Sequence, residues 1–184
     1  MGSRTSMLFM AVSRKDITLP ILDWMNDDNV QKLFEDAINN KSQIELFDLS
    51  GRGGNHFYDI LKVIERCNLE YLKFLDIDIL EDESGTVLKD IELIPVIRSF
   101  TIVIDELLKA VDPLWCLSSG YKNSEENMRE AFEKSEVCHN VNLDDYNIDS
   151  YYQEGLFIIL KSLLLVMTDA LVNNKVFVYI KCTA

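Results

Sequence analysis

Hydrophobic and polar positions along the chain follow two periods. Short apolar runs, or runs that alternate between apolar and polar residues, are typical of strands and occur at four places. The four expected strands cover residues 7–12, 44–49, 72–80 and 176–182. These runs divide the chain into segments long enough to hold helices.

Apolar residues at helical spacing predict helices in those segments. Buried helices are expected over residues 57–67, 87–111 and 151–172, and an exposed, charged helix over 125–135. Pro95 should break or kink the second of them, because proline removes a helical hydrogen bond and clashes with the preceding turn.

Residues 21–38 also have helical spacing, with Pro20 suited to a first turn. The polar run 26–29 leaves open whether this is one helix or two, with Asp28 or Asn29 capping the second. The alternation of strands with helices then predicts an α/β domain with a mixed, mostly parallel sheet and flanking helices. We expect residues 1–184 to form one domain, with 1–6 a cloning remnant.

Acidic residues dominate the charge and gather in the second half of the chain. The formal net charge is −13, and residues 76–154 carry 19 Asp and Glu against 6 Lys and Arg, which is the same surplus. Such a field repels nucleic acid and anionic membranes and speeds encounter with a basic protein. The expected partner is therefore a basic protein, with no nucleic acid and no membrane.

The cysteines and the longest apolar run indicate a cytoplasmic protein. Cys67, Cys116, Cys138 and Cys182 have neither zinc nor redox spacing, so reduced thiols are expected. The apolar run over residues 156–172 is broken by Lys161 and Asp169, which favours a buried helix over a membrane span.

Clustered carboxylates beside tyrosines are the strongest candidates for a partner-binding surface, because aromatic side chains anchor interfaces and carboxylates pair with Lys and Arg. The candidate residues are Asp76, Asp78, Glu81, Asp82, Glu83, Asp144, Asp145, Tyr146, Asp149, Tyr151 and Tyr152. Asp76 and Asp78, on one face of the expected strand, suggest a nuclease-like metal site as an alternative. The scarcity of Lys and Arg to hold phosphates opposes it, so we expect no metal and no cofactor.

A glycine-rich turn between an expected strand and an expected helix supports an alternative function. Backbone N–H groups at a helix N-terminus attract anions, so a small enzyme or sensor would bind an anionic ligand there. The residues of this alternative site are Ser50, Gly51, Arg52, Gly53, Gly54 and His56. The turn lacks the dinucleotide and P-loop patterns, no other residue completes a catalytic triad with His56 and Asp59, and we predict that the chain is not an enzyme.

In size, acidity and α/β pattern, the chain resembles bacterial toxin-immunity proteins, including those of contact-dependent inhibition systems. The resemblance covers the whole chain and rests on no signature motif, so it assigns no residue a role. It implies a protein that neutralises a cognate toxin, often a basic nuclease, by tight binding. A scaffold whose acidic residues serve only solubility is the remaining alternative.

Overall fold

The structure is a computed structural model that describes residues 5–16, 43–46, 52–76, 85–88, 90–109, 125–135 and 152–183. The strands are β1 (Thr5–Ser13), β2 (Gln43–Leu46), β3 (Gly85–Leu88) and β4 (Lys175–Thr183). The α-helices are α2 (Arg52–Arg66), α3 (Asp90–Lys109), α5 (Glu125–Lys134) and α6 (Tyr152–Val172). Two 3₁₀-helices, η1 (Arg14–Asp16) and η3 (Glu70–Leu75), complete the described elements.

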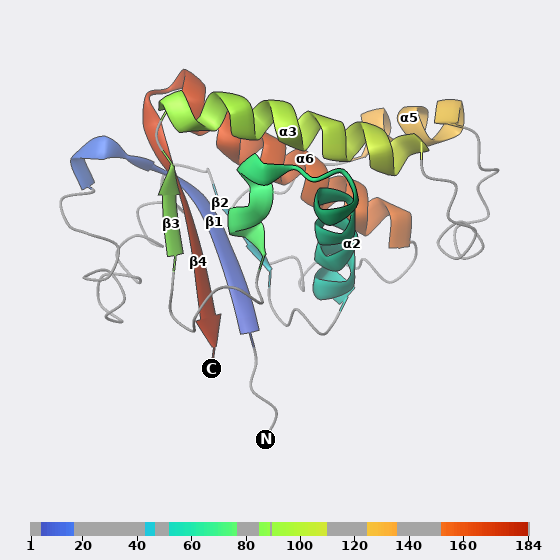
Figure 1. Cartoon of the computed structure of the whole chain (residues 1–184), viewed down its shortest axis with the longest axis horizontal. Coiled ribbons are helices and arrows are strands. Elements are labelled where there is room, and N and C mark those ends of the chain that lie inside the picture. Colours follow the sequence, from blue (N-terminus) through green and yellow to red (C-terminus); the bar gives the residue numbers. More distant parts are fainter. Residues whose placement is uncertain are drawn as a thin grey trace.

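One antiparallel sheet joins the two ends of the chain. Its strand order is β2-β1-β4-β3, and every pair of neighbours is antiparallel. The long strands β1 and β4 form the centre, with Phe9 opposite Tyr179 and Met10 opposite Val178. Helix α6 packs on both central strands, and α2 and α3 pack against α6 (Figure 1).

The prediction of an α/β domain with a mixed, mostly parallel sheet and flanking helices is therefore wrong, because every described strand pair is antiparallel. Residues 8 to 12 of β1 are all buried, so both faces of this strand are withdrawn from solvent. A strand buried on both faces has a continuous apolar sequence whichever way its neighbours run, although such runs are typical of parallel sheets. Helices pack beside parallel and antiparallel sheets alike, so their presence in the sequence pattern does not determine strand direction.

Three of the four expected strands are present, and the prediction of a strand over residues 72–80 is wrong. Residues 70–75 form η3, with Leu72 and Leu75 buried and Tyr71 exposed. The spacing of three between the buried leucines matches the 3₁₀ repeat, whereas the sequence predicts a strand from residue 72 onward. Strand β3 overlaps the start of the helix expected over residues 87–111, and residues 77–80 lie outside the described residues.

The expected helices are confirmed at α2, α3, α5 and α6, with different bounds. Helix α2 begins at Arg52 rather than Phe57, so Gly53 and Gly54 of the expected turn belong to its first turn. Helix α3 continues through Pro95, so a break there is wrong. Pro95 lies in the second turn, where its missing N–H costs one hydrogen bond to the Ile91 carbonyl. The expected helix over 21–38 lies outside the described residues.

Aromatic rings join the sheet to the helices at the centre of the core. The Phe9 ring lies 4.9 Å from that of Tyr179, 5.8 Å from that of Phe57 on α2 and 6.3 Å from that of Phe177. All four side chains are buried. Because each belongs to a different element or strand position, this cluster fixes α2 onto the β1–β4 pair.

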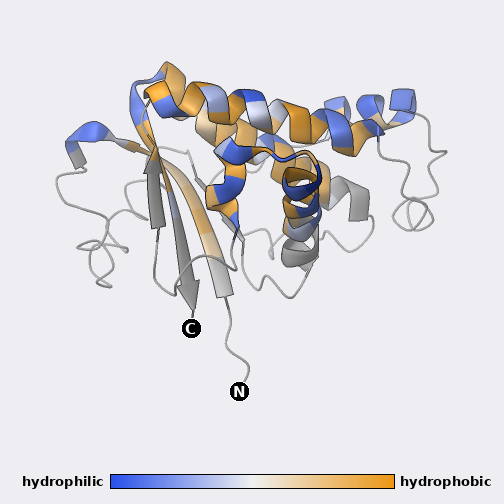
Figure 2. Cartoon of the chain, viewed as in Figure 1, coloured by the Kyte–Doolittle hydropathy of each residue, from blue (hydrophilic) through white to orange (hydrophobic). Residues whose placement is uncertain are grey.

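Helix α6 is apolar around most of its circumference, whereas α5 is mainly hydrophilic (Figure 2). Within α6, residues 155–172 are long and apolar enough to cross a membrane, and 61% of that segment is buried inside the fold. Central helices of globular cores have the same composition, because a helix surrounded by partners is hydrophobic all round.

An ion pair fixes the connection from α6 to β4. Asn174 has a φ of 54°, which reverses the chain after the helix, and Lys175 Nζ lies 2.9 Å from Asp169 Oδ2. Both side chains are less than one fifth exposed, at 19% and 18%. Partial burial strengthens such a pair relative to one on the surface, so the pair holds β4 in register with the end of α6.

Candidate functional site

A groove of about 560 Å³ lies between α2 and η3. Its apolar floor is formed by Leu61, Ile64 and Leu72, and its polar rim by Tyr58, Lys62, Glu65, Asn68, Lys73 and Asp76. We call this feature the α2–η3 groove. A small apolar floor with a few polar groups around it is typical of a binding site.

The end of α2 determines the shape of the groove. Asn68 adopts a φ of 50°, the Leu69 N–H donates to the Ile64 carbonyl at 3.0 Å, and the Asn68 N–H donates to the Glu65 carbonyl at 3.1 Å. These are the two hydrogen bonds of a Schellman motif, for which asparagine is well suited because it tolerates the left-handed conformation. The motif reverses the chain, so η3 returns beside the last turns of α2.

Aromatic contacts hold η3 against the sheet. The Phe74 ring meets the rings of Phe177 and Tyr179 edge-on, at 6.3 and 6.0 Å between centroids. Leu72 and Leu75 are buried in the same core. The rim residues Lys73 and Asp76 are therefore carried by a rigid segment, which favours binding without a large ordering cost.

Both lysines of the rim already have acidic partners. Lys62 Nζ lies 3.1 Å from Asp59 Oδ1, and Lys73 Nζ lies 2.7 Å from Glu70 Oε1. Among the described residues, no cation forms an ion pair with Glu65. The lining of the groove carries two lysines and two carboxylates, and the neighbouring Asp59 and Glu70 bring the local count to four carboxylates against two lysines.

The Asp76 carboxylate lies close enough to the core to influence a buried phenol. Burial, and then the negative charge of Asp76, raise the pKa of Tyr179 far above its ordinary value. The Tyr179 hydroxyl donates to Met7 Sδ at 3.9 Å, a weak bond to a thioether. The groove therefore stands directly above the aromatic centre of the fold.

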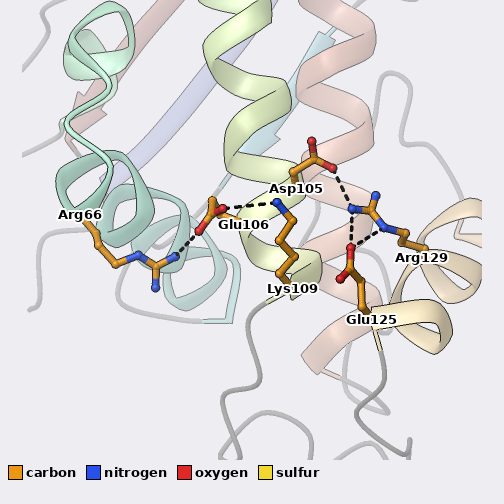
Figure 3. Close-up of polar contacts among 6 residues, drawn as sticks. All are labelled: Arg66, Asp105, Glu106, Lys109, Glu125 and Arg129. Atoms are coloured by element: carbon orange, nitrogen blue, oxygen red, sulfur yellow. Dashed lines mark hydrogen bonds and ion pairs between the residues drawn. The ribbon is translucent and has the colours of Figure 1, made fainter.

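A second polar feature links three helices at the far end of α3 (Figure 3). Arg129 on α5 lies 2.8 Å from Glu125 and 3.1 Å from Asp105, and these carboxylates raise the pKa of its guanidinium. Glu106 lies 3.3 Å from Arg66 and 3.6 Å from Lys109. This cluster has as many cations as carboxylates, and its members are largely exposed, so it orients α2, α3 and α5 more than it stabilises them.

The structure places one described member of the expected partner-binding surface in the groove, namely Asp76. It follows η3 and not a strand, so the expected strand face shared with Asp78 is wrong at Asp76. Tyr152 begins α6, and its side chain is not described. The remaining candidates, Asp78, Glu81, Asp82, Glu83, Asp144, Asp145, Tyr146, Asp149 and Tyr151, lie outside the described residues.

Four residues of the alternative anion site lie at the start of α2. Arg52, Gly53, Gly54 and His56 are helical, although their side chains are not described, and Ser50 and Gly51 lie outside the described residues. Within the described part of the chain, no group of His, Cys, Asp and Glu could hold a metal ion. The Cys67 thiol is free and half-buried, at the end of α2.

Sequence reasoning missed most of the groove. Tyr58, Leu61, Lys62 and Glu65 lie at i, i+3, i+4 and i+7 of α2 and so share one side of it. That spacing was a usable signal. The other wall, η3, was not predicted because a strand was expected over residues 72–80.

No family model, curated protein or solved structure matches this chain.

Proposed function

We propose that the protein is a non-catalytic binding protein that captures a basic protein partner, as an immunity protein captures a nuclease-type toxin domain. The observation that carries the proposal is the α2–η3 groove, which combines Glu65 and Asp76 with an apolar floor. A Lys or Arg side chain of the partner suits it, because its aliphatic stem covers apolar surface while its charged head pairs with a carboxylate.

Two exposed tyrosines support a protein ligand over a small molecule. Tyr58 on the rim is 37% exposed, and Tyr71 on η3 is 61% exposed. Tyrosine is enriched among residues that dominate binding energy at interfaces, since it offers a large, rigid contact area. Aromatic anchors next to carboxylates are suited to a basic surface.

The charge of the whole chain supports the same class of partner. A net charge of −13 on 184 residues accelerates the approach of a cationic protein and slows that of an anionic one. Long-range attraction governs the association rate, and close charge pairs govern dissociation. The groove would supply the close pairs, and the remaining acidic surface would supply the attraction.

Co-expression with the product of the adjacent upstream gene tests the proposal. We expect a stable complex whose association rate falls about tenfold or more between low and high salt, since attraction between exposed charges is screened within a Debye length. The association rate should be measured by stopped-flow at several salt concentrations. A complex whose association rate is independent of salt would contradict capture by charge, and the absence of any complex would contradict this choice of partner.

A further inference from the structure

Helix α3 exposes isoleucines along the side that faces away from the core. Ile91, Ile94 and Ile102 are 79%, 43% and 45% exposed. With Arg98 between them, they occupy positions i, i+3, i+7 and i+11, which fall on one face of a helix. We call these three isoleucines the isoleucine stripe, and it is about 16 Å long.

The stripe lies opposite the face by which α3 is held in the fold. Leu93, Val96, Phe100, Val103 and Leu107 form the buried face of the helix. In Figure 1, η3 and α2 lie below α3 and α6 lies behind it, while α5 meets α3 near its C-terminal end, where Arg129 pairs with Asp105. A surface helix ordinarily has polar residues on its outer face, so a row of isoleucines there calls for a partner.

The helix that carries this apolar row and the helix that packs on it, α5, are both acidic overall. Helices α3 and α5 together carry eight acidic and four basic residues. Arg129 already pairs with Glu125 and Asp105, and Lys134 with Glu130. The same two helices keep Glu126 and Glu133 exposed, and no described cation forms an ion pair with either carboxylate. An apolar row on an acidic pair of helices is complementary to a surface with an apolar row and basic flanks.

We propose that the isoleucine stripe is a second docking site, which binds an amphipathic helix with an apolar seam and flanking Lys or Arg residues. The three isoleucines span about three turns, which is the length over which a partner helix presents i, i+3, i+4 and i+7 residues. The stem of Arg98 extends the apolar surface between Ile94 and Ile102. No residue of α3 lines the α2–η3 groove, so this site is separate from the one above.

A second copy of the chain is a poorer occupant. Two copies would bring net charges of −13 together, and like charges across an interface cost several kcal/mol. A basic helix, in contrast, is attracted by the negative charge of the protein. The occupant is therefore a different, cationic chain.

The test uses a fluorescently labelled synthetic 18-residue peptide of leucine and lysine, with leucines at helical spacing, and measures its binding by anisotropy. Controls are a peptide of identical composition with the leucine spacing scrambled, and the variant Glu65→Gln/Asp76→Asn, which alters only the groove. The stripe variant is Ile91→Ser/Ile94→Ser/Ile102→Ser, which changes exposed positions and should fold normally, as circular dichroism and thermal unfolding would verify.

We expect the patterned peptide to bind about tenfold or more weakly to the stripe variant than to the natural protein, because burying even one isoleucine contributes that much to affinity. The groove variant should bind it within about twofold of the natural protein, so failure of the groove proposal leaves this one intact. Equal binding of the scrambled peptide, no binding, or an unaffected stripe variant would overturn the proposal. So would sedimentation showing stripe-dependent dimers, or stripe-dependent binding to phosphatidylcholine vesicles.

Discussion

Replacing Phe9 by alanine should lower the free energy of unfolding by about 3–5 kcal/mol, as large-to-small changes at well-packed aromatic sites do. The Phe9 side chain is fully buried and contacts aromatic rings on α2 and β4. Its removal deletes those contacts and leaves a cavity where the helices meet the sheet. Urea denaturation followed by circular dichroism measures the change.

Two matched variants separate this effect from a general sensitivity to substitution. Phe9→Leu retains most of the volume and should cost less than Phe9→Ala. Ile91→Ala removes a side chain that is 79% exposed, and should change stability by no more than about 0.5 kcal/mol. A Phe9→Ala variant as stable as Ile91→Ala would contradict the described core.

Reversing the charge of the groove should weaken capture of the basic partner by about 100-fold. In Glu65→Lys/Asp76→Lys, two attractive pairs become two repulsive ones, and a change of tenfold at each position is typical of close charge pairs. Most of the loss should appear as faster dissociation, because these residues act at close range. Biolayer interferometry with the co-purified partner measures both rates.

The control for this variant carries the same change in net charge elsewhere. Glu126→Lys/Glu133→Lys alters two exposed carboxylates of α5 and should slow association while changing dissociation by less than about twofold. The neutral variant Glu65→Gln/Asp76→Asn provides a milder version if the reversal disturbs folding. Equal dissociation rates for the groove and α5 variants would show that the groove is not the contact site.

Elements with long apolar runs could be predicted from the sequence. The central strands β1 and β4 and helix α6 have long apolar runs, and they lie within a few residues of their expected positions. Shorter elements were less accessible. Strand β3 has four residues, too few to show a period, and its pairing with β4 depends on distant residues.

Strand direction could not be predicted from the sequence, because a strand buried on both faces is apolar throughout in a parallel and in an antiparallel sheet alike. Met10 and Val178 face one another on the side of the β1–β4 pair away from the helical core, and both are buried. Burial on both faces gives β1 the continuous apolar sequence that is typical of strands in parallel sheets. The strand expected over residues 72–80 added to an alternation of strands and helices that is typical of parallel βαβ units, whereas every described strand pair is antiparallel.

The candidate site was partly predictable. Asp76 was identified from the density of acidic residues, but its position beside Glu65 depends on the Asn68 reversal and on η3. Neither feature has a strong sequence signature. The acidic character of the site could therefore be inferred from composition, whereas the proximity of Glu65 and Asp76 could be found only from the fold.

The most direct test of the central claim is a map of amide chemical shifts on adding an octapeptide of alternating arginine and glycine. The account predicts that the largest shifts fall on the rim of the α2–η3 groove, at Glu65, Asn68, Lys73 and Asp76, and that Glu65→Gln/Asp76→Asn abolishes them. An octapeptide of alternating glutamate and glycine should leave these amides unchanged. Shifts spread evenly over the acidic surface, or retained in full by the variant, would contradict a groove that captures basic side chains.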